Sequence, residues 1–150
     1  MGYAYEASSI HILLEVEKIM RIYTSYYANM RNIPDDIVPI SIAGKAPDWY
    51  NGLEYKKLAP KIGFFTEWKN KNLSNDWYTH RFNDEVLDKL NAESVFSDLE
   101  QLTGGKDCVL LCYEKPDSFC HRHLVSTWFS HKLDLVVYEL STNKENNIRR

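Results

Sequence analysis

The segment Asp107 to Glu114 (DCVLLCYE) decides the fold, because its centre is an unbroken apolar run. Such a run, without polar alternation, is typical of a strand buried on both faces, as in parallel sheets. A helical pattern follows from Phe119 to Lys132, with Asp117 or Ser118 as its expected N-cap. A second apolar strand is predicted from Asp134 to Leu140 (DLVVYEL). Strand, helix and strand together predict a βαβ unit with parallel strands and a right-handed crossover.

The rest of the chain extends this architecture. Periodicity and turn residues predict further strands and helices; the strands are Ile19–Tyr26 and Ile37–Ile42, and the helices are Tyr5–Lys18, Phe64–Lys71, Asp76–Leu90 and Ser94–Leu102. Between positions 43 and 61 we expect a long aromatic loop. The predicted fold is a single α/β domain over residues 1–150, with an open, mostly parallel sheet and a Rossmann-like three-layer arrangement. Residues 1–18 are interpreted as an N-terminal extension and residues 141–150 as a flexible tail.

Composition limits the classes of function. The net charge of −3 disfavours indiscriminate polyanion binding, so direct nucleic-acid binding is not expected. Three cysteines are an odd number and do not indicate a disulfide framework. No signal peptide or membrane span is evident, so we expect a cytoplasmic protein without membrane partners. The oligomeric state stays open.

The predicted strand ends indicate where a ligand would bind. In open α/β sheets, ligands bind beyond the carboxyl ends of the strands. Residues expected at that edge are Thr24, Ser25, Tyr26, Gly44, Lys45, Cys112 and Glu114. Aromatic side chains nearby, including Trp49 and Tyr50, are candidates for a wall on which a base-like ring stacks, with core packing as the equal alternative.

The tripeptide Cys120-His121-Arg122 begins the last helix at the same edge. A helix N-terminus favours anions and lowers the pKa of a thiol. Cys120 is therefore the candidate thiolate, and Arg122 is the candidate clamp for a phosphate or carboxylate. Helical spacing points Cys120 and His121 inward, whereas His123 faces water.

Each candidate also has a purely structural interpretation. Cys120 and Cys112 are also interpretable as buried apolar residues, and Cys108 more so. His121 is also interpretable as a satisfied core histidine, and Arg122 as a structural partner of Glu114. Cys112, Cys120 and His121 could converge on a metal, but structural zinc sites usually include a pair at C-x₂₋₄-C spacing, which Cys112 and Cys120 do not have. We therefore expect no metal and no cofactor.

The stretch LLCYEKPDSFCHRHLVSTWF (110–129) resembles the signature of the domain-of-unknown-function family 488. Segments such as IYTSYYAN (22–29) and SIAGKAPDWYNG (41–52) are similar to the compact branch of that family, and the resemblance spans Arg21 to Leu140. It implies an α/β fold and a site at Cys112, Glu114, Cys120, His121 and Arg122. It implies no particular activity.

Three functions remain open. The first is a protein that binds a small anionic, nucleotide-like ligand through Arg122 and the helix N-terminus. The second is a cysteine-dependent enzyme acting on a nucleotide or nucleobase-type substrate, with Cys120 as nucleophile, His121 as acid/base and Glu114 orienting it. The third is a phage-type interaction or inhibitor protein that uses the aromatic loop from Trp49 to Tyr55.

Overall fold

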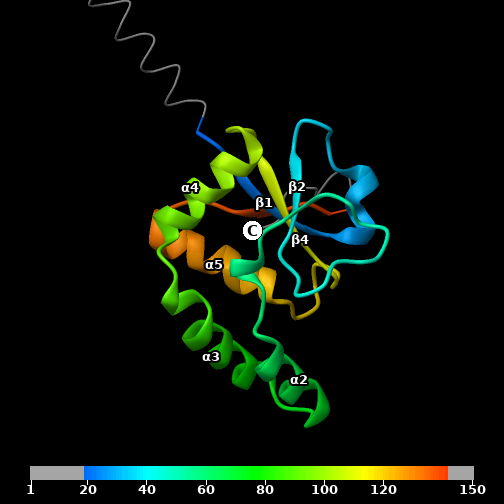
Figure 1. The fold of residues 1–150 in the computed structure, drawn as a ribbon, viewed down its shortest axis with the longest axis vertical. Helices are drawn as coiled ribbons and strands as arrows, with labels where there is room; N and C mark the ends of the chain where they lie inside the picture. Colours follow the sequence, from blue (N-terminus) through cyan, green and yellow to red (C-terminus); the bar gives the residue numbers. More distant parts are fainter. Residues whose placement is uncertain (1–18, 142–150) are drawn as a thin grey trace, which may run out of the picture.

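The computed structural model describes residues 19–141, which form an open sheet of five parallel strands in the order β3-β2-β4-β1-β5 (Figure 1). The strands are β1 Ile22–Tyr26, β2 Val38–Ser41, β3 Leu53–Glu54, β4 Cys108–Cys112 and β5 Tyr138–Glu139. Every residue of β4 is buried, as the apolar run predicts for the central strand. The open parallel α/β fold is thus confirmed.

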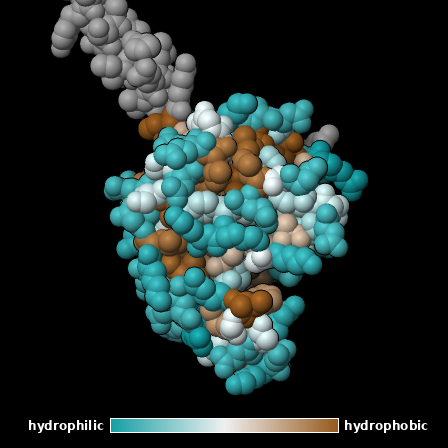
Figure 2. Space-filling view, viewed as in Figure 1, coloured by the Kyte–Doolittle hydropathy of each residue, from teal (hydrophilic) through white to brown (hydrophobic). Residues whose placement is uncertain are grey.

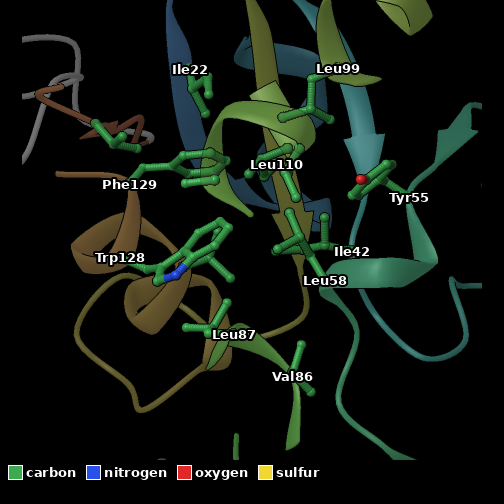
Figure 3. Packing of buried hydrophobic residues seen from close by; sticks show 14 of the residues in the cluster. Ile22, Ile42, Tyr55, Leu58, Val86, Leu87, Leu99, Leu110, Trp128 and Phe129 are labelled. Carbon is green, nitrogen blue, oxygen red and sulfur yellow. The ribbon is translucent and has the colours of Figure 1, made fainter. Parts of the chain in front are cut away.

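Within residues 19–141, four α-helices contribute to the core on one face of this sheet, and two of them extend beyond the end of the sheet (Figure 1). They are α2 Ile62–Asn70, α3 Asn75–Glu85, α4 Ala92–Thr103 and α5 His121–Leu133, and the 3₁₀ turns are η1 Tyr27–Asn32, η2 Lys56–Leu58 and η3 Leu87–Lys89. Figure 3 shows Ile22 and Leu110 of the sheet packed with Leu99 of α4 and Phe129 of α5. This large cluster contains the buried apolar side chains of α2 to α5 and forms the main core.

The other face of the sheet has a thinner cover. Val109 and Leu111 of β4 point to this side, where they pack with Tyr27 of η1, Ala43 and Leu140. This second layer is built from a 3₁₀ helix and loops, and its buried cluster includes no residue of α2 to α5.

The molecular surface seen from the same side as in Figure 1 is mostly hydrophilic, with separate apolar patches (Figure 2).

Several predicted boundaries differ from the structure. The strand β3 lies inside the segment predicted as loop, the helix expected over Asp76–Leu90 ends at Glu85 and is followed by η3, and the last strand has only two residues. The strands β4 and β5 are parallel as predicted, but β1 lies between them. The predicted N-cap of α5 was wrong: Cys120 occupies that position. The predicted helix Tyr5–Lys18, the extension 1–18 and tail residues 142–150 lie outside the described residues.

Helix α4 ends at a glycine that the backbone requires. Gly104 has φ +67° and its N–H donates to the carbonyl of Glu100, which terminates the helix in the left-handed conformation. An alanine there meets no atom within 4 Å, so the expected penalty comes from the backbone alone. We expect Gly104→Ala to lower the free energy of unfolding by about 1–2 kcal/mol in urea titrations. The control, Gly63→Ala inside α2, should raise it by up to about 1 kcal/mol; equal effects would contradict the assignment.

Within residues 19–141, none of the helices combines the length and apolar character needed to cross a bilayer.

Candidate functional site

The carboxyl ends of the three central strands meet at one edge of the sheet. Tyr26 of β1 is in register with Cys112 of β4, and Ser41 of β2 is in register with Leu111. Helix α5 starts at this edge, because the loop after β4 is only eight residues long and ends at Cys120. The strand ends that the sequence predicted to be neighbours therefore are neighbours.

Cys112 and Cys120 form a disulfide that joins the end of β4 to the N-cap of α5. This corrects the expectation of unpaired cysteines: an odd count excludes a complete framework but does not exclude one local bridge. Both residues are buried. Cys108, at the other end of β4, is free, and burial raises the pKa of its thiol to about 12. Its packing role is the one expected for a free cysteine inside an apolar strand.

His121 presents one ring nitrogen to both sulfur atoms. Its Nε2 lies 2.8 Å from the carbonyl oxygen of Ile42, which can only accept, so Nε2 carries the hydrogen. Its Nδ1 lies 3.6 Å from Sγ of Cys112 and 3.9 Å from Sγ of Cys120. Burial lowers the pKa of His121 to about 4, and the nearby charges of Arg122 and His123 act in the same direction. The ring is neutral at pH 7, and Nδ1 directs an unprotonated lone pair at the sulfurs.

The residue that orients His121 is not the one that the sequence indicated. Glu114 lies exposed on the loop between β4 and α5, whereas the carbonyl of Ile42, at the end of β2, holds the ring. The ring also packs against Phe82 of α3, with centroids 5.4 Å apart. Backbone carbonyls leave no signature in a sequence, so this contact was not predictable from residue types.

Arg122 lies completely buried, at 0% exposure, and binds a carboxylate of the chain itself. Its Nε donates to Oε1 of Glu139 at 3.0 Å and its Nη2 donates to Oε2 at 2.8 Å. Thr24 adds a bond from Oγ1 to Oε1 at 2.6 Å, and the guanidinium lies 5.9 Å from the ring centroid of Tyr26. The partner of Arg122 is thus Glu139 of β5 rather than Glu114, and the third guanidinium nitrogen, Nη1, is buried without a hydrogen-bond partner.

Glu139 is the buried charged residue that sequence reasoning missed. A signal was present, since a glutamate inside the apolar stretch VVYEL is unusual unless it is paired. Glu139 and Thr24 also line a cavity of about 410 Å³, together with Ser118, His123 and Ser126 from the α5 side. Cys112, Cys120 and His121 do not line this cavity.

Other predicted rim residues have structural contacts. Ser25 donates to the carbonyl of Leu140 at 2.8 Å and accepts from Asn29 at 3.1 Å, so it ties β1 to the segment after β5. The carbonyl of Gly44 accepts from Lys56 at 2.6 Å. Lys45 is exposed and lies 3.8 Å from Asp48. These groups belong to the rim but do not converge on the cysteines.

Aromatic rings gather on the face of the sheet that carries Val109 and Leu111, opposite the face that α5 covers. The ring of Tyr27 lies at the centre of this aromatic cluster, 4.8 Å from Tyr113, 5.6 Å from Tyr50 and 6.2 Å from Trp49 between centroids, all edge to face. Trp49 is 62% exposed and Tyr113 is 51% exposed. The sequence identified Trp49 and Tyr50 but not Tyr27 or Tyr113. Trp49 and Tyr50 thus lie in one aromatic cluster, in which the rings of Trp49 and Tyr113 are open to solvent.

One comparison with known proteins found a matching family. The family model DUF488-N3a, described as the active DUF488-N3 subclade, matches residues 13–133. No curated protein and no solved structure matches the chain. The matched residues include Cys112, Glu114, Cys120, His121 and Arg122, which are the residues that the resemblance implied. The chain belongs to the DUF488 family.

Proposed function

We propose that this chain is a cysteine-dependent enzyme, with Cys120 as nucleophile and His121 as the group that accepts its proton. One observation carries the proposal: the unprotonated Nδ1 of a neutral, buried histidine lies within 3.9 Å of two cysteine sulfurs. A nucleophile beside a positioned base is the recurring arrangement of covalent catalysis. The description of the matching family model as an active subclade also supports an enzyme.

The fold distributes the roles between the two cysteines. Cys120 is the N-cap of α5, where the partial positive charge of a helix N-terminus stabilises a thiolate. Cys112 lies at the end of β4 and is not part of the helix terminus. The disulfide is the resting form in this proposal, so reduction precedes catalysis. In the reduced form the proton of Cys120 moves to Nδ1 of His121, and Ile42 keeps the ring oriented through Nε2.

The pairing of Arg122 with Glu139 favours this function over simple anion capture, because two of the three guanidinium nitrogens already donate to that carboxylate. The proposed substrate class is a nucleotide or nucleobase-type molecule. Exposed Trp49 and Tyr113 offer flat surfaces on which such a ring stacks.

The proposed thiolate is tested by alkylation of the reduced, metal-free protein over pH 5–9, with rates assigned to each cysteine by peptide mass spectrometry. We expect the rate of Cys120 to rise with a midpoint clearly below the pKa of about 8.5 that free cysteine shows. Partial burial scales the whole curve but leaves its midpoint unchanged, so accessibility does not confuse the result.

Cys108 serves as the internal control, since its burial and raised pKa predict no reaction in the folded protein. His121→Gln keeps a donor for Ile42 but removes the base, and should move the midpoint of Cys120 upward. A wild-type midpoint at or above that of a free thiol would exclude Cys120 as the nucleophile.

The substrate class is tested by calorimetric titration with a panel of nucleoside monophosphates and nucleobases. If a member of the panel binds, Trp49→Ala should weaken its affinity by about 1–3 kcal/mol, because stacking on one ring is worth that much. The matched control is Ile62→Ala, which removes another exposed apolar side chain remote from the aromatic cluster. Equal losses from both changes would contradict stacking on Trp49.

A further inference from the structure

We propose that the reduced protein binds a zinc ion through Cys112, Cys120 and His121, with a fourth coordination position left for water or substrate. The inference goes beyond the proposed function, since it does not require Cys120 to act as a nucleophile. Zinc would occupy the thiolate of Cys120 and Nδ1 of His121, so the zinc-bound form is a state separate from the catalytic one. Within residues 19–141, this is the one group of three or more His, Cys, Asp or Glu side chains whose ligand atoms all lie within 4.8 Å of one another.

The histidine is prepared for a metal by its outer contact. Histidines that bind metals usually donate their second ring N–H to a carbonyl or carboxylate, which fixes the tautomer. Ile42 provides that carbonyl at 2.8 Å from Nε2, and the opposite nitrogen faces both sulfurs. The ring is therefore held in the tautomer and orientation that coordination through Nδ1 requires.

The spacing of the backbone also suits two ligands around an ion. The Cα atoms of Cys112 and Cys120 are 7.4 Å apart. Most disulfides have Cα atoms about 4.4–6.8 Å apart. Two thiolates that bind one ion do not have to lie within bonding distance of each other, so this wider Cα separation suits them at least as well as it suits a disulfide.

Charge favours the metal form once the bridge is reduced. Both cysteines and His121 are buried, and two uncompensated thiolates are costly in such a place. One divalent cation with two thiolates and a neutral imidazole gives a site of zero net charge. Glu139 already compensates Arg122, so that guanidinium is not needed to balance the thiolates.

The ligand types select the metal. Thiolate sulfur and imidazole nitrogen are the donors that zinc prefers, whereas magnesium and calcium prefer oxygen. Three protein ligands and one open position are the arrangement of catalytic rather than structural zinc sites. Zinc binding requires two steps. A dithiol reductant first supplies two electrons and two protons to the Cys112–Cys120 bond and itself becomes a disulfide. Zinc then displaces one proton from each of the two thiols.

The test uses the full chain, reduced with a phosphine and freed of metal without oxygen, and titrated with Co²⁺ followed by Zn²⁺. We expect one Co²⁺ per chain, with the strong visible absorption of tetrahedral thiolate coordination and its loss when Zn²⁺ displaces it. Cys112→Ser and His121→Gln should weaken binding at least about tenfold, whereas Cys108→Ser should not change it.

A second measurement needs only the wild-type chain. Stoichiometric Zn²⁺ should slow alkylation of both Cys112 and Cys120 in the reduced protein at least about tenfold. Absence of the cobalt spectrum, or no protection by zinc, would overturn the inference, and so would equal loss of binding in Cys108→Ser. The proposed function can fail separately. If the protein bound zinc but the alkylation rate of Cys120 rose with the same pH midpoint as that of a free thiol, the metal site would stand and Cys120 would be excluded as the nucleophile.

Discussion

Replacing Glu139 by alanine is expected to lower the free energy of unfolding by about 3–5 kcal/mol, the loss typical of a buried pair from which one partner is removed. Arg122 is fully buried and two of its nitrogens bond to this carboxylate. Without Glu139, the positive charge stays in the interior and Thr24 loses its acceptor. Equilibrium unfolding in urea at pH 7, followed by circular dichroism, measures the effect.

Two control variants distinguish the loss of the Arg122–Glu139 ion pair from a general effect of mutation on stability. Asp48→Ala removes an exposed partner of Lys45 and should change the free energy of unfolding by less than about 1 kcal/mol. The double change Arg122→Met and Glu139→Leu should recover at least half of the loss, because it leaves no buried charge. A loss below about 1 kcal/mol in Glu139→Ala would mean that Arg122 has another partner or reaches solvent.

The free energy of unfolding should also fall by about 3 kcal/mol between pH 7 and pH 4 because of His121 alone. The pKa of this histidine is about 4 in the folded protein, against 6.5 for the unperturbed group. The unfolded chain therefore takes up a proton first as the pH falls. The contribution of His121 is complete above pH 6.5 and is lost progressively down to pH 4.

The variant His121→Gln isolates this contribution from that of the carboxylates. Its amide can still donate to Ile42, but it does not titrate in this range. Urea unfolding at half-unit intervals should give a steeper acid loss in the wild type than in the variant, and the two curves should separate below pH 6.5. Parallel curves would show that His121 is solvated or protonated in the folded protein.

The central strand was predictable because its environment is uniform. Every side chain of β4 is buried, so the segment is apolar throughout. A strand covered on both faces accounts for such a run better than any other kind of secondary structure. Strand β3 was not predictable for the opposite reason. It has two exposed residues, Leu53 and Glu54, and it exists only through backbone pairing with β2. Backbone hydrogen bonds do not select residue types.

The location of the site was predictable, but several of its contacts were not. The rule that strand ends meet at one edge correctly brought Cys112 close to Cys120 and His121. The partner of Arg122 depends instead on strand order, because the pairing of β1 with β5 places Glu139 in register with Thr24. The sequence shows that β5 exists but not which strand it joins. The disulfide likewise depends on the path of the loop between β4 and α5. The number of cysteines in the chain does not reveal that path.

The most direct measurement of the central claim is the protonation state of each ring nitrogen of His121 in the oxidised protein, with the Cys112–Cys120 disulfide intact, from ¹⁵N spectra of histidine-labelled protein between pH 5 and 8. Both the proposed catalysis and the proposed zinc site require an unprotonated Nδ1 facing the two sulfurs. The structure predicts the tautomer with hydrogen on Nε2, and a neutral ring throughout this range. A hydrogen on Nδ1, or a ring that gains a second proton near pH 6.5, would contradict the account.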